Sequence, residues 1–233
     1  MLHRKSDQCT TCDNCNIRSP LFNLLNEDEL KIMNAGRFEV VFNTGENIIK
    51  QGTSAAHLIM LTRGISKLYL EGIDKRNLIL KLVPAWKLFG APGLYTDFRY
   101  QYSVSALTES SACFIPSDNV RKVIRSNPDF AEGLLKHCNQ NNADNYDRLV
   151  SLTQKQMPGR LADVLLYLSK EIHRSIAFNL LITRQEIGEM SNMTKESATR
   201  ILKEFETEGI IKIETKTIEI LKMETLKEIS LHG

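Results

Sequence analysis

The segment from Thr183 to Phe205 constrains the fold of this chain more than any other part of its sequence. Thr183-Arg184-Gln185-Glu186 has the T-x-x-E pattern of a capping box, which predicts the start of a short helix. Asn192 tolerates a left-handed backbone and interrupts that helix, and Thr194 can cap a second one. Two short helices separated by a turn of three or four residues form a helix-turn-helix.

The second predicted helix places polar and charged side chains on one outward face. Those near its N-terminal end are Lys195, Glu196, Thr199 and Arg200. In a helix-turn-helix this end enters the major groove of DNA. Arginine can bond O6 and N7 of guanine together, and glutamate can accept a hydrogen bond from N4 of cytosine. The wet face of an ordinary amphipathic helix has the same pattern, so spacing alone leaves both interpretations open.

The residues that follow, up to Leu221, predict a β-hairpin. Isoleucines alternate on both sides of the polar turn Glu214-Thr215-Lys216-Thr217. A helix-turn-helix followed by a hairpin is a winged helix, and its wing can contact phosphates through Lys212 and Lys216. Arg184, at the start of the first helix, is a further candidate DNA contact.

Charge does not by itself indicate nucleic-acid binding. The net charge is +2, and from Pro158 onward the chain carries 11 Lys and Arg against 12 Asp and Glu. Because non-specific DNA affinity comes mainly from counterion release, a near-neutral domain predicts modest non-specific binding.

The part of the chain before this region predicts a β-rich domain. Leu21 to Phe38 has helical spacing, with Asn26 as a plausible N-cap. From Phe42 to Pro116, short runs of Ile, Leu, Val and Tyr are separated by glycines at near-regular spacing. Short strands with such turn signals indicate an all-β sandwich or barrel.

A long helix is predicted from Pro128 to Leu152. The residues at helical spacing along its predicted seam are Phe130, Leu134, Cys138, Asn141, Asn145, Leu149 and Leu152. An apolar seam that contains asparagines is typical of a two-stranded coiled coil, in which the polar positions fix register and partner number. We therefore expect this helix to form a homodimer; a solvated linker helix is the alternative.

The five cysteines are unevenly placed. Cys9, Cys12 and Cys15 form C-x2-C-x2-C, whereas Cys113 and Cys138 stand alone. In a reducing compartment such a cluster indicates metal binding or thiol redox chemistry rather than disulfides.

The remaining features place the chain in a class. No stretch approaches the roughly 18 apolar residues of a membrane-spanning helix, and the N-terminus has no apolar core of a secretory signal. We expect a cytoplasmic protein without a membrane partner. An enzyme, namely a small iron–sulfur or dithiol oxidoreductase using Cys9 and Cys12, is the alternative of another class. No nucleotide-binding glycine loop, Ser/His/Asp arrangement or paired carboxylates near the cysteines favour it.

The chain resembles the CRP/FNR superfamily of bacterial transcription regulators over nearly its whole length. Three segments carry the resemblance: the glycine-punctuated run from Phe42 to Tyr69, Gly159-Arg160-Leu161-Ala162, and the helix-turn-helix with Lys195-Glu196-Ser197-Ala198-Thr199-Arg200. The resemblance implies a regulator rather than an enzyme. It also implies that Glu196 and Arg200 read bases, with Lys195 and Thr199 beside them. A homodimer on a palindromic double-stranded operator and RNA polymerase are the implied partners.

The implied fold class is α+β. It consists of a cysteine-rich segment (1–20), a jelly roll, or double-stranded β-helix, similar to cyclic-nucleotide-binding domains (21–127), a dimerisation helix (128–157) and a winged helix-turn-helix (158–233).

The resemblance also bears on the signal. Relatives that bind cyclic AMP use a Gly-Glu-Leu segment and an Arg-Ser pair, where this chain has Gly90-Ala91-Pro92-Gly93-Leu94 and Tyr100-Gln101-Tyr102-Ser103. A buried cyclic phosphate without a cation is costly, which disfavours cyclic AMP, although a shifted alignment would supply Arg99.

The cysteines resemble those of the FNR branch, which implies a [4Fe–4S] cluster on Cys9, Cys12, Cys15 and Cys113 that senses oxygen, nitric oxide or redox state. The FNR pattern has a wider gap before its third N-terminal cysteine, and here that place falls near Leu21, so Cys9 must substitute. Zinc on the same thiolates, free thiols, or a sensor that binds a small molecule or a haem-bound gas are the alternatives.

Overall fold

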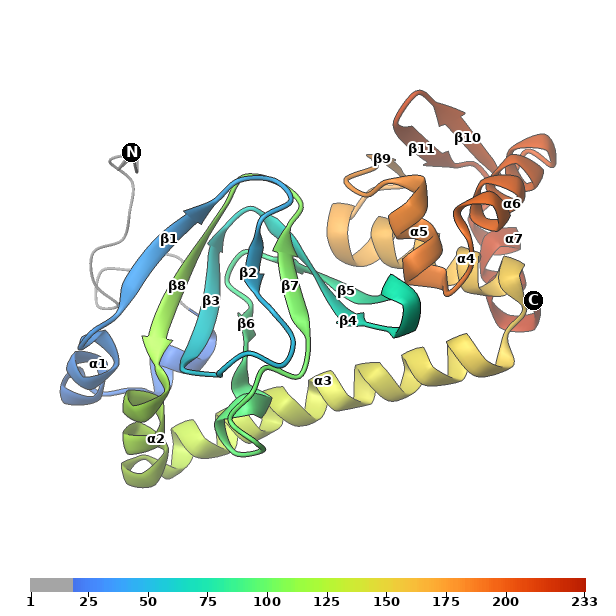
Figure 1. Ribbon diagram of the computed structural model, residues 1–233. Helices are drawn as coiled ribbons and strands as arrows, with labels where there is room; N and C mark the ends of the chain where they lie inside the picture. Colours follow the sequence, from blue (N-terminus) through green and yellow to red (C-terminus); the bar gives the residue numbers. More distant parts are fainter. Residues whose placement is uncertain (1–18) are drawn as a thin grey trace. The chain divides into compact units, whose positions relative to one another are not determined.

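The computed structural model describes residues 19–233 (Figure 1). These residues form two compact units: the first contains residues 19–68 and 83–142, and the second contains residues 69–82 and 143–233. Cys9, Cys12 and Cys15 lie outside the described residues.

The eight strands of the N-terminal half form a jelly roll (Figure 1). One sheet has the order β1-β8-β3-β6 and the other has the order β2-β7-β4-β5. The strands are β1 (Phe38–Phe42), β2 (Asn47–Ile49), β3 (His57–Arg63), β4 (Ile65–Glu71), β5 (Asn77–Pro84), β6 (Leu88–Phe89), β7 (Ser103–Ala106) and β8 (Ser110–Pro116). The predicted β domain is confirmed. Together with the α-helices of the chain, it gives the predicted α+β fold class.

Tight turns between these strands require glycine. Gly64 joins β3 to β4 with φ +85°, and a Cβ added there would lie 2.3 Å from the Ser110 side-chain oxygen. A left-handed backbone and this close approach exclude other residues.

Short helical elements precede, connect and follow the strands of the jelly roll. They are the 3-10 turns η1 (Pro20–Leu24), η2 (Ile73–Lys75) and η3 (Ala91–Leu94), and the α-helices α1 (Glu27–Asn34) and α2 (Ser117–Ser126). Asn26 caps α1 as predicted, in a capping box with Glu29. The predicted helix extended to Phe38, but α1 ends at Asn34. Phe38 instead begins β1, where it pairs with Phe114 of β8, and the two rings stack with centroids 5.1 Å apart.

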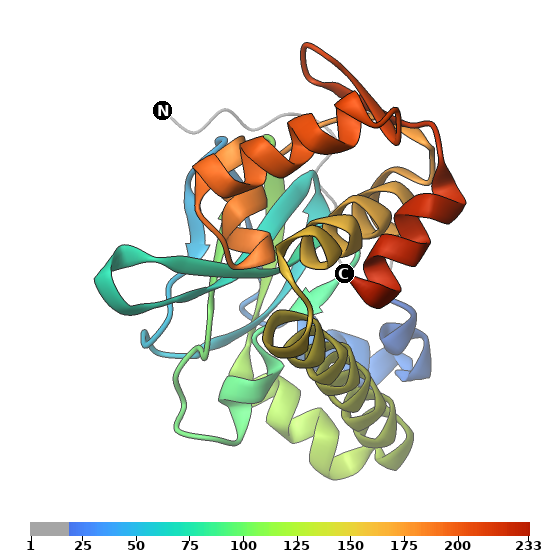
Figure 2. The same ribbon diagram turned by 90° about the vertical axis from the view of Figure 1, so that its right-hand side faces the viewer.

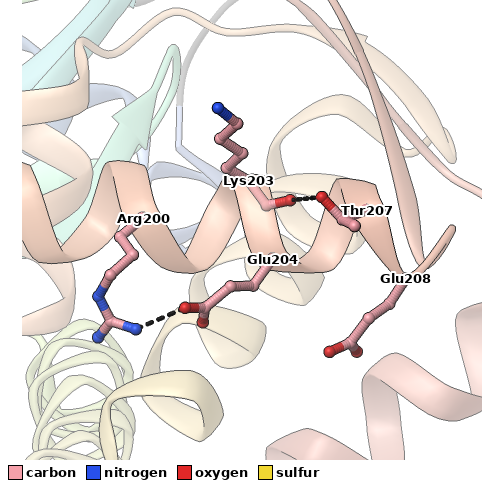
Figure 3. A pocket seen from close by; sticks show the side chains of 5 residues that line it. All are labelled: Arg200, Lys203, Glu204, Thr207 and Glu208. Carbon is pink, nitrogen blue, oxygen red and sulfur yellow. Dashed lines mark hydrogen bonds and ion pairs between the residues drawn. The ribbon is translucent and has the colours of Figure 1, made fainter.

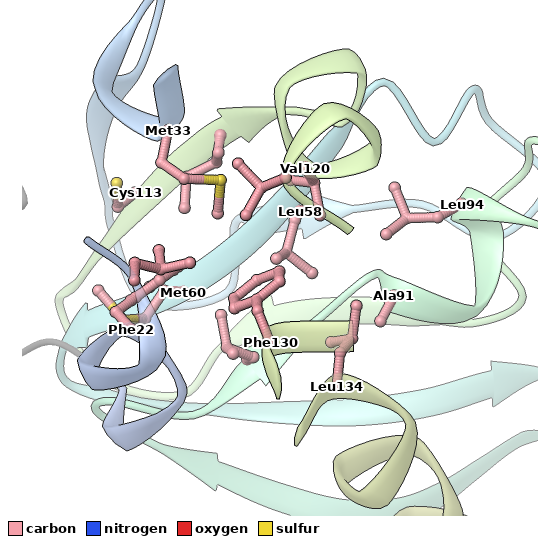
Figure 4. Close-up of a cluster of buried hydrophobic side chains, with 14 of the residues drawn as sticks. Phe22, Met33, Leu58, Met60, Ala91, Leu94, Cys113, Val120, Phe130 and Leu134 are labelled. Atoms are coloured by element: carbon pink, nitrogen blue, oxygen red, sulfur yellow. The ribbon is translucent and has the colours of Figure 1, made fainter. Parts of the chain in front are cut away.

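The long helix is present as α3 (Pro128–Gln154). Its first turns complete the core of the jelly roll: Phe130 and Leu134 are buried in the same apolar cluster as Phe22, Met60 and Cys113 (Figure 4). The predicted seam was therefore wrong in this part, because these side chains face their own domain rather than a partner.

The C-terminal half is the predicted winged helix-turn-helix. Its elements are α4 (Met157–Tyr167), the π-helical turn η4 (Leu168–His173), β9 (Ala177–Asn179), α5 (Arg184–Ser191), α6 (Lys195–Thr207), β10 (Ile211–Glu214), β11 (Thr217–Ile220) and α7 (Met223–His232). The wing has the strand order β10-β11-β9, so a third strand joins the predicted hairpin. The helix α7, which the sequence did not predict, packs on α4 (Figure 2).

A carboxylate ties the helices of this unit together. Asp163 on α4 accepts hydrogen bonds from Ser151 of α3 at 2.5 Å and from Ser230 of α7 at 2.5 Å, and it pairs with the Lys155 ammonium at 2.8 Å. Three separate donors on one carboxylate fix the junction between α3 and α4.

The β4–β5 hairpin also enters the second unit. The Tyr167 hydroxyl accepts from the backbone N–H of Leu82 at 3.0 Å and donates to its carbonyl at 3.2 Å. Burial raises the pKa of Tyr167 to about 12, so this hydroxyl stays protonated and can keep both bonds. No helix among residues 19–233 is long and apolar enough to cross a membrane.

Candidate functional site

The helix-turn-helix is built by local caps. The Thr183 hydroxyl accepts from the Glu186 N–H at 3.2 Å, and the Glu186 carboxylate accepts from the Thr183 N–H at 2.7 Å. Asn192 ends α5 in the left-handed conformation with φ +48°. Thr194 then caps α6 by accepting from the Ser197 N–H at 3.2 Å. All three sequence predictions for this motif are confirmed.

The turn is pressed against α5 at Gly188. A Cβ at this position would lie 2.7 Å from the Met193 carbonyl oxygen and 3.2 Å from the Thr194 carbonyl carbon. Both neighbours are backbone atoms, so no side-chain rotation can make room for the added Cβ.

Gly188→Ala is therefore expected to lower the free energy of unfolding by about 1–3 kcal/mol, despite the roughly 1 kcal/mol by which alanine favours a helix over glycine. Urea unfolding of the variant beside Gln185→Ala, an exposed change on the same helix, measures this. A Gly188→Ala protein as stable as the wild type would show that the turn does not depend on close contact.

One face of α6 is buried and the other is open. The buried side chains are Ala198, Ile201, Leu202 and Phe205. The four predicted DNA contacts on this helix are all exposed: Lys195, Glu196, Thr199 and Arg200. The winged-helix architecture puts this exposed face where the major groove is read.

Arg200 already has an acidic partner. Its Nη1 lies 2.6 Å from Glu204 Oε1, and both side chains remain about half exposed (56% and 47%). An open hollow beside α6 is lined by Arg200, Lys203, Glu204, Thr207 and Glu208 (Figure 3). Lys203 was not predicted as a contact, although its place three residues after Arg200 puts it on the same face.

Arg184 is placed differently from the other candidates. Its side chain is half-buried, and the buried Nη1 has no hydrogen-bond partner among the described residues. Burial lowers the pKa of Arg184, and the Glu206 carboxylate opposes that shift. The geometry therefore gives Arg184 an internal environment rather than a place on the open face of α6. A role in DNA contact remains a prediction.

The wing carries one paired and one open lysine. Lys212 Nζ lies 2.6 Å from Glu214 Oε1 on β10, and this ion pair raises the pKa of Lys212 and lowers that of Glu214. Lys216 is exposed in the turn between β10 and β11. Exposed ion pairs are weak, so Lys212 can exchange Glu214 for a phosphate at small cost.

Of the two segments that the family resemblance matches to the cyclic-nucleotide site, the one from Tyr100 to Ser103 contains a buried and a partly buried tyrosine. The Tyr102 hydroxyl accepts from the Gly90 N–H at 2.8 Å, and the Tyr100 hydroxyl donates to the His57 carbonyl at 2.9 Å. Burial raises the pKa of Tyr102 to about 12. The Arg99 guanidinium donates to the Gly52 carbonyl at 2.6 Å in an exposed position.

Cys113 lies on β8 in the apolar cluster and is 1% exposed (Figure 4). It pairs in register with Met60 of β3. The backbone N–H of Ser19, the first described residue, donates to Met60 Sδ at 3.3 Å. The Arg37 guanidinium donates to Cys113 Sγ at 3.1 Å.

Among residues 19–233, no three His, Cys, Asp or Glu side chains form a group that could hold a metal. A metal site of three or more such ligands that includes Cys113 therefore requires ligands from residues before Ser19. Cys138 on α3 is half-buried, and burial raises the pKa of its thiol.

Two family profiles match this chain. The profile described as cyclic nucleotide-binding domain matches residues 39–127, and the profile described as Crp-like helix-turn-helix domain matches residues 159–229. The chain is 27% identical over 177 residues to the cAMP-activated global transcriptional regulator CRP of Pasteurella multocida, covering 74% of this chain and 85% of that protein. It is 24% identical over 191 residues to the CRP-like cAMP-activated global transcriptional regulator of Mycobacterium tuberculosis, covering 80% of this chain and 85% of that one.

Solved structures show the same fold. FixK2 from Bradyrhizobium japonicum superposes with a TM-score of 0.76 at 19% identity, covering 84% of this chain and 98% of FixK2. A CooA variant from Carboxydothermus hydrogenoformans superposes with a TM-score of 0.70 at 17% identity, covering 92% and 96%. The curated relatives are regulators of transcription rather than enzymes, which removes the oxidoreductase interpretation. With a cyclic-nucleotide-binding-like domain followed by a Crp-like helix-turn-helix, the chain belongs to the CRP/FNR superfamily of DNA-binding transcription regulators.

Proposed function

We propose that this regulator binds palindromic DNA as a homodimer, and that a [4Fe–4S] cluster on Cys9, Cys12, Cys15 and Cys113 sets its DNA affinity in response to oxygen, nitric oxide or redox state. The position of Ser19 supports this proposal most directly. Ser19 bonds Met60, and Met60 is the register partner of Cys113. Register partners in adjacent antiparallel strands have Cα atoms about 5 Å apart.

The length of chain before Ser19 suits such a site. Cys15 precedes Ser19 by four residues, and four residues span at most about 14 Å. The sequence separation between Cys15 and Ser19 is therefore compatible with Cys15 and Cys113 as ligands of one cluster. Cys9 and Cys12 follow the x2 spacing of compact cluster-binding runs, in which a remote cysteine completes the set.

The surroundings of Cys113 also suit a thiolate ligand. Its sulfur accepts a hydrogen bond from a guanidinium and is shielded from solvent. Four thiolates are the usual ligands of a [4Fe–4S] cluster. When bound, such a cluster supplies iron–sulfur chemistry that responds to oxygen and nitric oxide.

The core offers a route from Cys113 to α3. Phe130 and Leu134 of α3 pack in the same buried cluster as Cys113 and Met60. Because protein interiors are close-packed, a change in the position of Cys113 changes the packing of the side chains around it. A signal at Cys113 thereby alters the packing of the first turns of α3. It shifts the DNA-binding equilibrium only as far as the two states differ in affinity for it.

The exposed face of α3 supports the homodimer. Its residues repeat at alternating steps of four and three and are all exposed: Leu135, Asn139, Asn142, Tyr146, Leu149 and Thr153. Steps of four and three are the heptad spacing of a coiled coil, and the two asparagines are the kind of polar seam residue that fixes register. This seam differs from the predicted one and shares only Leu149 with it.

Leu149→Asp is expected to weaken dimerisation by about 1.5–3 kcal/mol per subunit, because the leucine leaves the seam and a charge enters it. Sedimentation equilibrium of this variant beside Lys136→Asp, which changes an exposed residue on another face of α3, measures the effect. A dimer unaffected by Leu149→Asp would place the subunit interface elsewhere.

On DNA, the two α6 helices of a dimer are expected in successive major grooves about 34–36 Å apart. The near-neutral charge of residues 158–233 implies that base contacts carry more of the affinity than phosphate contacts do. We include RNA polymerase as the partner of the DNA-bound regulator, on the strength of the family alone.

A cyclic nucleotide, zinc and haem are the competing signals. The tyrosines at positions 100 and 102 and the outward Arg99 leave a cyclic phosphate without a cation, which argues against a cyclic nucleotide. Zinc binds the same four thiolates, so metal analysis is needed to distinguish a zinc site from an iron–sulfur cluster.

The test is anaerobic purification followed by iron and sulfide analysis and a visible spectrum. We expect about four irons per subunit and a broad absorbance that bleaches when air is admitted. Colourless protein with zinc, a haem spectrum, or metal-free protein that binds cyclic AMP in calorimetry would each overturn the cluster proposal.

A further inference from the structure

The hydrogen bond between Arg37 and Cys113 joins residues that are far apart in the sequence. Arg37 Nη1 lies 3.1 Å from Cys113 Sγ across 76 residues. Arg37 follows α1 and precedes β1, and its own N–H donates to the Asn34 carbonyl at 3.1 Å. Its backbone is therefore held by a helix end on one side and a sheet on the other, and its half-buried side chain extends to the sulfur.

A carboxylate lies opposite the same cysteine. Glu39 of β1 is the register partner of Cys113, and residues directly opposite each other share a sheet face. Glu39 Oε1 accepts from the Thr62 hydroxyl, and its buried Oε2 has no hydrogen-bond partner among the described residues. An anionic thiolate beside this carboxylate is repelled, and Arg37 is the cation in contact with the sulfur.

We propose that Arg37 is a positioning residue for the iron–sulfur site, which holds the Cys113 thiolate in place as a ligand and offsets the negative charge of Glu39. This inference rests on the cluster proposed above. Hydrogen bonds to an ionised acceptor are about twice as strong as neutral ones. Partners that hold a ligand in this way commonly change metal affinity 10–100-fold.

The test compares Arg37→Gln and Arg37→Lys with Arg63→Gln. Arg63 is a matched control, because it lies on the same sheet but pairs with the exposed Glu109. Each protein is loaded anaerobically, and the transfer of iron to a chelator is timed without any change of oxidation state. Resonance Raman spectra then report the iron–sulfur(Cys) stretching bands, which shift upward when a hydrogen bond to the sulfur is lost.

We expect Arg37→Gln to lose iron about tenfold faster than the wild type and to shift the Raman bands, Arg37→Lys to fall between, and Arg63→Gln to match the wild type. A second result would also support the proposal: Arg37→Gln folds but assembles no cluster, whereas Arg37→Lys and Arg63→Gln assemble it. In that case the cation at position 37 is required for cluster assembly. Wild-type kinetics and bands in Arg37→Gln would overturn the role of Arg37 and leave the cluster standing. A wild-type protein that binds no cluster would instead overturn the proposed function itself.

Discussion

Cys113→Ala is expected to abolish the iron and sulfide content and the visible absorbance of the anaerobic protein, because a four-thiolate site loses one ligand. Alanine is preferred to serine as the replacement. Cys113 is 1% exposed in an apolar cluster, and a serine hydroxyl there would add about 1–3 kcal/mol of desolvation cost.

Cys138→Ala is the matched control. Cys138 is a half-buried thiol on α3, and it has no proposed role as a ligand. It should keep the full cluster. Equal thermal unfolding of the two variants separates loss of a ligand from loss of the fold. A Cys113→Ala protein that retains four irons would remove Cys113 from the ligand set.

Arg200→Ala is expected to lower operator affinity about 5- to 160-fold per half-site, which corresponds to about 1–3 kcal/mol. The loss of sequence preference is expected at the one base pair that Arg200 contacts. Arg200 lies on the exposed face of α6 and forms an exposed ion pair with Glu204, which is weak enough for the guanidinium to turn to a guanine. Binding to the operator and to its single-base variants, at one salt concentration, measures both effects.

Lys227→Ala is the control for this experiment, since Lys227 is a cation of the same unit that pairs with Glu224 on α7. If Arg200→Ala weakens binding equally to every sequence, Arg200 contacts a phosphate and does not read a base. If affinity is unchanged, Arg200 does not contact the operator.

The helix-turn-helix could be predicted from the sequence because it is specified by contacts of short range. Thr183 and Glu186 satisfy each other across three residues, and Thr194 caps α6 across three more. Capping residues act on the adjacent turn of backbone, so their spacing is visible in the sequence itself. The β-hairpin of the wing was predictable for the same reason.

The first part of the predicted α3 seam was wrong because helical spacing shows which residues share a face but not what that face contacts. Phe130 and Leu134 have the spacing of a dimer seam, yet they close the core of their own domain. The exposed residues at heptad spacing, which include Leu135 and Tyr146, are identified by the burial pattern along α3 and not by its sequence. Tertiary packing therefore determines which residues of one helix are buried in the core.

The environment of Cys113 was beyond prediction from sequence for a related reason. Cys113 was identified as a candidate ligand through family resemblance, but nothing near Arg37 in the sequence marks it as the donor to that sulfur. The two meet because β1 and β8 pair in one sheet, a contact across 76 residues. Likewise, the outward placement of Arg99 depends on the Gly52 carbonyl, which lies 47 residues away.

The most direct test of signal-dependent DNA binding is the affinity of the anaerobically purified protein for a selected palindromic duplex, measured before and after brief exposure to air. We expect a footprint over two half-sites, and a change in affinity of at least about tenfold, or 1.4 kcal/mol, when the visible absorbance bleaches. Sequence-specific binding with the same affinity before and after the loss of absorbance would contradict a cluster that controls this regulator.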